Sequence, residues 1–324
     1  MCDFGVRCQA EGEFIPWEEA FEPLARVPES SPWFVEAQLV KAMVFVRQRN
    51  SVRALNSYHA ILRHVERENT PSTTKQRHLR DLTWMHTAQF QFAISRNYEP
   101  GLRRSLQAYN QLERDSAHFD DSRFEQAWVL FHMGQHEQSL RNLDSLPADY
   151  LLLRPEAHLL RAMIHYARCD HEATVAALET LRNTHGDERD ELRELRSSLG
   201  FERAFEIAIG RADVSRWPSR STSAFLAQAP HKPSLRRRVD SIDRIDEELD
   251  QLASSSEELH GTPLHNRILS ETRLLRSIEA ETLERSVSRF LQMREEEISG
   301  LIEFGLAIEV ESTARLDHQN PCER

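Results

Sequence analysis

Glycine is scarce in this sequence, with 10 residues among 324, and the motifs that depend on glycine are missing. There is no phosphate-binding loop of the Walker type and no dinucleotide-binding glycine fingerprint. The sequence also lacks a serine nucleophile elbow, a paired-histidine zinc motif and a calcium-binding loop. These absences predict that the protein is not an enzyme and that it holds no cofactor and no metal.

Cysteine is also rare, and its spacing excludes the common cysteine-based architectures. The four cysteines are Cys2, Cys8, Cys169 and Cys322, and no two of them form a CxxC pair. This spacing is typical of neither a disulfide framework nor a zinc ribbon.

One cluster of metal-binding residue types occurs near the middle of the chain. His158 and His165 share a helix face, and Cys169, Asp170 and His171 follow within two turns. Imidazole and thiolate ligands suit zinc. We favour the simpler interpretation, in which Cys169 packs as a small apolar residue and the histidines are exposed.

Long apolar runs are absent, and no stretch approaches the roughly 18 residues needed to span a bilayer. Acidic residues interrupt every apolar stretch of the first 30 residues, so no export signal is predicted. We therefore expect a cytoplasmic protein, or a periplasmic or envelope protein if the true start lies upstream. The net charge of −11 gives the chain no general attraction to phosphate backbones, so nucleic acid is not an expected partner.

Residues that favour helices are abundant, and they predict an all-α fold. Four segments share one pattern, in which two helices each carry a small residue and are joined by a short polar turn. The small residues of the first helices are at positions 42, 88, 127 and 162, and those of the second helices are at 54, 101, 139 and 174. The last two spacings, 139−101 = 38 and 174−139 = 35, lie close to the 34-residue tetratricopeptide period. We expect a right-handed α-solenoid of helix pairs, with a non-repeating bundle as the alternative.

The pattern divides the chain into five parts. Residues 1–30 form an N-terminal segment that is partly helical, and residues 31–210 form the repeats. Residues 211–235 hold three prolines and read as a linker. Residues 236–316 form long helices, and residues 317–324 a disordered tail. The long helices fit either an antiparallel coiled-coil hairpin, which could self-associate, or two helices docked on the repeats.

Partners of helical-repeat arrays usually lie in a groove lined by the first helices. The polar residues of those helices that carry no packing are the candidate groove residues, namely Gln38, Lys41, Gln89, Arg123, Gln126 and Arg161. Arginine and glutamine at such positions suit a carboxylate-bearing or extended peptide.

Two stretches carry a resemblance to a known family. The order FEQAWVLFHMGQHEQSL followed by RPEAHLLRAMIHYARCDHEA resembles tetratricopeptide proteins of myxobacteria and related deltaproteobacteria, some of them named as adventurous gliding-motility proteins. The stretch EEEISGLIEFGLAIEVE looks like the helical tail of those proteins. The resemblance covers residues 80–190 well and 235–312 loosely, and it implies no catalytic residues.

The predicted function is therefore a scaffold or adaptor that binds a protein or peptide. One alternative is a structural component of an envelope or motility complex. A less favoured alternative is an enzyme with an unrecognised site.

Overall fold

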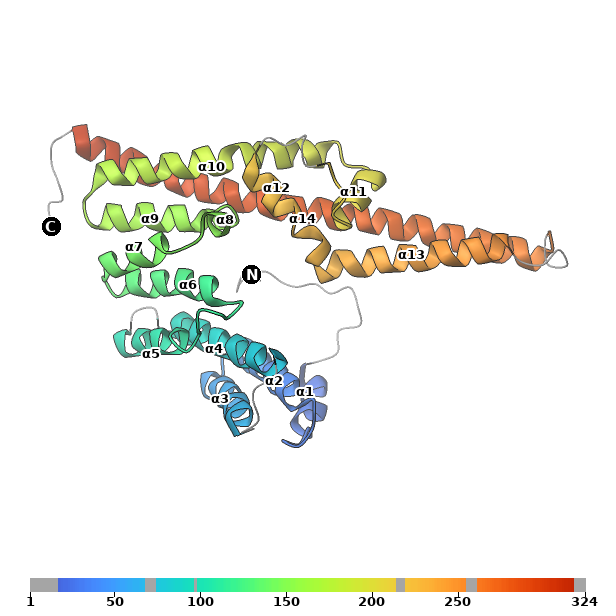
Figure 1. The fold of residues 1–324 in the computed structure, drawn as a ribbon, viewed down its shortest axis with the longest axis horizontal. Helices are drawn as coiled ribbons and strands as arrows, with labels where there is room; N and C mark the ends of the chain where they lie inside the picture. The colour runs from blue at the N-terminus through green and yellow to red at the C-terminus, as the bar shows by residue number, and fades with distance from the viewer. Residues whose placement is uncertain (1–16, 68–73, 96–97, 214–218, 255–260, 318–324) are drawn as a thin grey trace. The chain divides into compact units, whose positions relative to one another are not determined.

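The computed structural model of this chain describes residues 17–67, 74–95, 98–213, 219–254 and 261–317. All regular elements in this part of the chain are helices, and no strand occurs among them (Figure 1). Residues 1–142 and residues 143–324 form two compact units, here unit 1 and unit 2. None of the described helices is long and apolar enough to cross a membrane.

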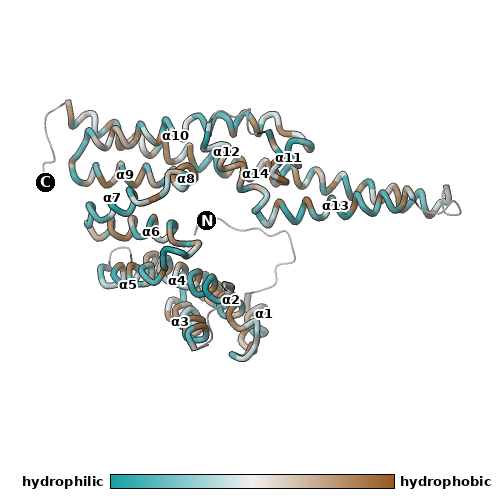
Figure 2. The backbone as a smooth tube through the Cα atoms, viewed as in Figure 1, coloured by the Kyte–Doolittle hydropathy of each residue, from teal (hydrophilic) through white to brown (hydrophobic). Residues whose placement is uncertain are grey.

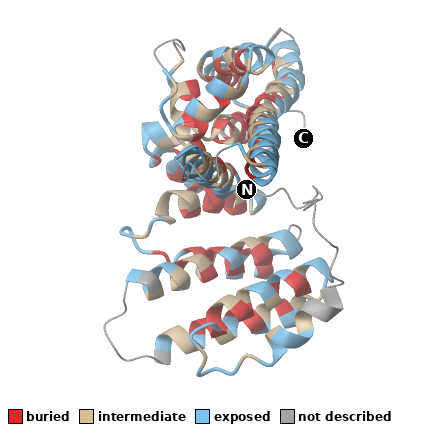
Figure 3. Ribbon diagram, turned by 90° about the vertical axis from the view of Figure 1, so that its right-hand side faces the viewer, coloured by how far each residue is buried: buried red, intermediate tan, exposed pale blue. Residues whose placement is uncertain are grey.

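Unit 1 is built from helices that pack in pairs. It contains α1 (Trp17–Ala25), α2 (Phe34–Arg47), α3 (Ser51–Arg67), α4 (Thr74–Ile94), α5 (Glu99–Tyr109), α6 (Phe119–His132) and most of α7 (His136–Asp144). The buried residues concentrate on the sides where helices meet (Figure 3).

Unit 2 holds one further helix pair and the long C-terminal helices. It contains α8 (Ala148–Leu151), α9 (Pro155–Ala167), α10 (His171–Ser197), α11 (Phe201–Ala208), α12 (Arg220–Leu226), the short 3₁₀ turn η2 (Ala229–His231), α13 (Pro233–Ala253) and α14 (Pro263–Asp317).

Three helix pairs, α2–α3, α6–α7 and α9–α10, share the same turn. Two residues after the end of each first helix lies a residue in the left-handed region, with φ of 57° at Arg49, 70° at Gly134 and 62° at Cys169. In each case the next residue donates its N–H to the carbonyl five residues earlier, at 2.9, 2.9 and 3.0 Å. This is the Schellman arrangement, which satisfies carbonyls left free at a helix end. The left-handed residue follows the small residue of its first helix by seven positions in all three pairs.

The small residues predicted for the helix crossings are buried where the helices meet. Ala42, Ala88, Ala127 and Ala162 are fully buried. Across the α6–α7 crossing, the Ser139 hydroxyl donates to the carbonyl of Ala127 at 2.6 Å. Small side chains at these positions let the two helix axes approach closely.

The crossing of the α4–α5 pair differs from the prediction. Ser105, rather than Gly101, donates its hydroxyl to the carbonyl of Ala88, at 2.8 Å. Gly101 lies against Ser95 at the end of α4, where an added Cβ would be 2.0 Å from the serine Oγ. The connection between these helices is one residue longer than in the other pairs, and the two crossing residues are 17 positions apart in the sequence, against 12 in the α6–α7 pair.

The core of unit 2 joins α10 to the C-terminal helices. Buried residues from α10, α11, α12, α13 and α14 form one cluster, which includes Leu192, Ala204, Phe225, Leu235 and Leu291. Phe225 stacks on Phe290, with ring centroids 4.4 Å apart. Within the stretch 211–235, where we expected a linker, the structure places α12, η2 and side chains of this core.

The two arrangements considered for the C-terminal helices apply to different parts of α14. Its N-terminal part pairs with α13 through Arg276 with Asp246 at 2.5 Å, and through Arg238 with Glu279 at 3.1 Å. Its C-terminal part packs on α9 and α10, and Gly305 permits the close approach, because an added Cβ would lie 2.8 Å from Leu178.

The apolar residues along α14 are only partly buried. Leu283 and Val287 are fully buried, whereas Leu275 and Phe304 are exposed. The predicted tail at 317–324 and the N-terminal residues up to 16 lie outside the described residues, except that Asp317 ends α14.

Candidate functional site

None of the six residues predicted to line a groove is exposed. Gln38 and Gln126 are buried, and Lys41, Gln89, Arg123 and Arg161 are half-buried. Five lie in unit 1, and Arg161 lies in unit 2.

Three of the six make hydrogen bonds to neighbouring helices. Gln126 accepts from Asn142 of α7 at 3.4 Å, and Gln89 donates to Glu125 of α6 at 3.4 Å. Arg161 donates to Asp144 at 2.5 Å. Gln126 and Arg161 directly precede the buried alanines of their helices, so they face a packed neighbour. The positions that directly follow the four alanines are half-buried at Gln89, Trp128 and Met163 and exposed at Met43.

A face of α9 shows how unit 2 uses these following positions. Met163 and Tyr166 lie one and four residues after Ala162. Leu301, Ile302 and Ile308 of α14 pack against the cluster that contains Ala162, with Met163 beside it.

The polar end of the same contact involves Tyr166. The guanidinium of Arg315 lies 5.6 Å from the centre of its ring, and the Glu311 carboxylate is its hydrogen-bond partner. Proximity to that carboxylate raises the pKa of Tyr166. An amphipathic helix thus occupies the face of this helix pair.

The matching face of unit 1 carries large apolar side chains. Met43 of α2 and Trp128 of α6 directly follow the buried alanines, and Phe92 of α4 and Phe131 of α6 lie four residues after theirs. Met43 is 60% exposed, and the three aromatic residues are half-buried. We call Met43, Phe92, Trp128 and Phe131, together with Gln89, the first-helix face.

Histidine rings border the aromatic part of this face. The ring of His132 lies 5.2 Å from Phe92 and 5.8 Å from Phe131, and His136 lies 5.8 Å from Phe131. Such a surface offers apolar area together with polar ring edges, a combination that is common at protein interfaces.

A buried ionic cluster lies between α10 and α14 within unit 2. Arg294 binds Glu188 with two hydrogen bonds, of 2.7 and 3.4 Å, and it also donates to the carbonyls of Leu152 and Leu153. His185 contacts the same carboxylate at 2.7 Å. Burial raises the pKa of Glu188, but the His185 and Arg294 contacts outweigh it, and its pKa lies below the ordinary value. Glu188 is therefore ionised, and both of its carboxylate oxygens accept hydrogen bonds. Such a residue is better suited to hold α10 and α14 together than to act as a catalytic base.

Two titratable groups of α9 border this cluster. Burial, with the nearby Glu297 carboxylate, raises the pKa of Glu156 to about 7. Burial also lowers the pKa of His158 to about 4, together with the neighbouring ring of His185, whose centroid is 5.7 Å away. The protonation of Glu156, and with it the charge of this region, therefore changes near neutral pH.

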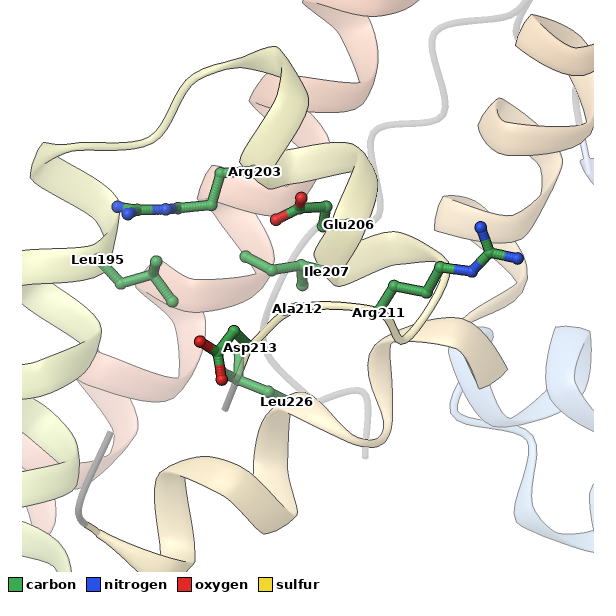
Figure 4. A pocket seen from close by; sticks show the side chains of 8 residues that line it. All are labelled: Leu195, Arg203, Glu206, Ile207, Arg211, Ala212, Asp213 and Leu226. Carbon is green, nitrogen blue, oxygen red and sulfur yellow. The ribbon is translucent and has the colours of Figure 1, made fainter. Parts of the chain in front are cut away.

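A small pocket opens between α10, α11 and α12 (Figure 4). Its volume is about 160 Å³, its wall is apolar at Leu195, Ile207 and Leu226, and Arg203 and Arg211 stand at its rim. Ligand pockets usually measure about 300–1,000 Å³. This pocket is too small to hold a substrate of ordinary size.

The cluster considered for zinc does not assemble. Within the described residues, no group of three or more histidine, cysteine, aspartate and glutamate side chains could hold a metal ion. His165 instead lies 3.4 Å from Asp170. The interpretation that we favoured is also wrong, because Cys169 is disulfide-bonded, His171 is buried, and His158 and His165 are half-buried rather than exposed.

None of the protein families, curated proteins or solved structures compared with the chain matches it.

The interactions of Arg294 and Glu188 were not predicted from the sequence, although a signal for them exists. Arg294 lies on the stripe of Val287, Leu291 and Ile298 in α14. A charge at such a core position indicates a buried partner.

Proposed function

We propose that this protein is a non-enzymatic scaffold, built on degenerate tetratricopeptide-like repeats, whose first-helix face binds an amphipathic helix of a partner protein. The observation that carries the proposal is the packing of α14 on the α9–α10 pair. There, an amphipathic helix lies with its apolar side on Leu159 and Ala162 of α9 and on Leu178 of α10, and with its polar side at Tyr166 of α9, so the face of α9 that corresponds to the first-helix face forms part of the contact.

The repeat interpretation is supported by the shared turn at Arg49, Gly134 and Cys169. It is also supported by the crossing residues once Ser105 replaces Gly101. The last two spacings become 139−105 = 34 and 174−139 = 35, against the tetratricopeptide period of 34, whereas the first becomes 105−54 = 51. Helical-repeat proteins commonly bind partners along a surface made by equivalent helices.

The side chains of the first-helix face suit a helical ligand. Methionine adapts its shape to different apolar partners, and tryptophan and phenylalanine are frequent anchors at interfaces. Helix-in-groove recognition uses apolar side chains spaced by three and four residues. The partner is therefore expected to present leucine-, isoleucine- or phenylalanine-type residues at that spacing.

Site-specific photocrosslinking tests this proposal. A photoreactive amino acid at Met43 of the full-length chain should crosslink a protein in the native host, and the crosslinked peptide should come from a helical segment with that spacing. A synthetic copy of the segment should then bind the purified chain, and Met43→Glu should weaken its binding at least tenfold.

The matched control places the photoreactive amino acid at Gln107, an exposed position of the second helix α5. Equal crosslinking from both positions, or a synthetic segment that binds Met43→Glu as well as the unmodified chain, would contradict the proposal.

A further inference from the structure

The hairpin of α13 and the first part of α14 exposes an apolar stripe at its far end. Leu264, Ile268, Leu275 and Ile278 are all exposed, between 40% and 64%. Figure 2 shows apolar segments alternating with polar ones along this part of α14. Leu283 and Val287, which follow in the helix, are fully buried, and further exposed apolar side chains occur beyond them at Met293, Phe304, Leu306 and Val310.

This stripe is a second seam, separate from the one that contacts α13. Each member directly precedes a residue of the inner seam, which comprises His265, Leu269, Arg276 and Glu279. Arg276 and Glu279 pair with α13. Successive residues of an α-helix lie about 100° apart. The helix therefore presents one side to α13 and an adjacent side to solvent, which is the pattern of a helix in a bundle of more than two helices.

Helix α13 adds to the same face. Asp246 lies on the inner seam opposite Arg276, and Ile245 directly precedes it. In an antiparallel pair of right-handed helices, the residues that precede the inner seam lie on the same side of both helices. Ile245 and Leu252, both half-buried, therefore flank the α14 stripe. We call these six apolar residues the hairpin face.

We propose that the hairpin face binds the hairpin face of a second copy of this chain, forming a four-helix bundle in which each α14 lies on the partner copy's α13. The charges of α13 and α14 favour a second copy of this chain as the partner. Residues 240–253 of α13 contain six acidic residues and one arginine, whereas residues 263–278 of α14 contain three arginines and one glutamate. Arg276 pairs with Asp246 and Arg267 with Glu271 in the same chain, so the complementarity across the interface comes from Arg273 and the remaining acidic residues of α13.

Two face-to-face arrangements related by a two-fold axis are available, and the charges decide between them. If the hairpins pointed in opposite directions, the two acidic α13 helices would lie on each other. If they point the same way, each acidic α13 lies on a basic α14, and all neighbouring helices are antiparallel. Opposite charges across an interface favour the second arrangement.

The size of the face predicts a reversible dimer. Residues 264–278 extend about 22 Å, and two helices are about 20 Å wide, so about 900 Å² would be covered in total. This lies below the usual area of stable interfaces, which begins at roughly 1,200 Å². The dimer should therefore dissociate on dilution.

Analytical ultracentrifugation of the full chain tests the inference. The unmodified chain should approach twice its mass of 37.7 kDa at high concentration. Leu275→Glu should remain at the monomer mass, with at least a tenfold weaker association. Leu306→Glu is the matched control, because Leu306 lies on the same helix with an equal exposure of 55% against 54%, and it should dimerise normally. Equal helical content and melting of both variants by circular dichroism would show that folding is intact.

The orientation is tested by a genetically encoded spin label at Arg289, which is exposed and lies about 27 Å along α14 from the centre of the face, so that only hairpins pointing the same way bring the two labels close together. Pulsed electron paramagnetic resonance should give one short distance between the two copies. A monomeric unmodified chain, a dimer unaffected by Leu275→Glu, or a dimer whose labels lie far apart would each overturn the proposal. The result is independent of the first-helix face, since Met43→Glu should leave dimerisation unchanged.

Discussion

Arg294 and Glu188 lie 106 residues apart in the sequence, yet they form a bidentate ion pair inside unit 2. Their side chains are 5% and 0% exposed. The Arg294 guanidinium also lies 5.5 Å from the ring of Phe225, which covers it. The pair fixes the position of α14 on α10, because neither charge can be left without the other in an apolar interior.

Removing one partner of this pair should be costly. We expect Arg294→Met and Glu188→Leu each to lower the free energy of unfolding by about 3–5 kcal/mol, because each removes the main partner of a buried charge and leaves it only His185 or Glu297. The double variant should lose much less free energy of unfolding than the sum of the losses of the two single variants. Urea unfolding of all three variants measures the coupling, and additive losses would argue against a clasp.

A surface pair between the same helices provides the control. Arg182 binds Glu309 with side chains that are 37% and 18% exposed. Arg182→Met should cost only about 0–1 kcal/mol, since solvent screens exposed pairs.

The pKa of Glu156 predicts a pH dependence of stability. Its pKa in the folded chain is about 7, above the ordinary value of 4.5. The folded state therefore binds this proton more tightly than the unfolded state, so the contribution of Glu156 falls as pH rises from about 4.5 to about 7. Glu156→Gln should raise the free energy of unfolding at pH 8 by about 1–3 kcal/mol and should have little effect at pH 4.

Protonation of His158 lowers the stability of the folded chain at acidic pH, whereas ionisation of Glu156 lowers it near neutral pH. Its pKa of about 4 lies below the ordinary value of 6.5, so its contribution to stability is lost as pH falls from about 6.5 to about 4. Urea unfolding of the unmodified chain and of Glu156→Gln between pH 4 and pH 8 separates the two groups. If the free energy of unfolding of Glu156→Gln varied with pH in parallel with that of the unmodified chain, Glu156 would not be the group whose protonation changes stability.

The left-handed turn residues predict a reciprocal pair of variants. Arg49 has a φ of 57°, which is unfavourable for a side chain with a Cβ, whereas Gly134 holds the same position with a φ of 70°. Arg49→Gly should stabilise unit 1 by roughly 0.5–1 kcal/mol, and Gly134→Ala should destabilise it by about 1 kcal/mol. Thermal unfolding measures both. Shifts of the same sign for the two variants would show that the turns are not equivalent.

Unit 2 should require its C-terminal helices in order to fold. Residues 235–324 supply Leu235, Leu283, Leu291 and other residues of its core. After their removal, the amide hydrogens of α10 should exchange with solvent at least a hundredfold faster, while those of α4 and α5 keep their protection. Hydrogen exchange read by mass spectrometry tests this, and unchanged protection of α10 would mean that α9 and α10 fold alone.

The sequence predicted the helical class and most of the helix crossings, because small residues at fixed spacing reflect local contact geometry. Ala127 with Ser139 is the clearest example. The crossing at Ser105 was missed because the connection between α4 and α5 changes length, and spacing alone cannot detect such a shift. The groove residues were chosen for polarity, yet Gln126 and Arg161 are polar because they bond to neighbouring helices.

The contacts between distant segments could not be read from periodicity. His185 and Glu188 interrupt the apolar stripe of Leu178, Leu181, Leu192 and Leu195 in α10, as Arg294 interrupts that of α14. Each interruption indicates a buried polar contact. Only the packing of α14 on α10 shows that the two interruptions meet.

The unbroken length of α14 gives unit 2 a mechanical property. The helix has 55 residues, which corresponds to about 80 Å at 1.5 Å per residue. Arg294 anchors it in the core, and Leu264 lies 30 residues away, at about 45 Å. Acting as a lever arm, the helix would convert a rotation of about 5° at its anchor into a displacement of about 4 Å at its far end. A force applied at the hairpin end would therefore be transmitted along α14 to the Arg294–Glu188 pair.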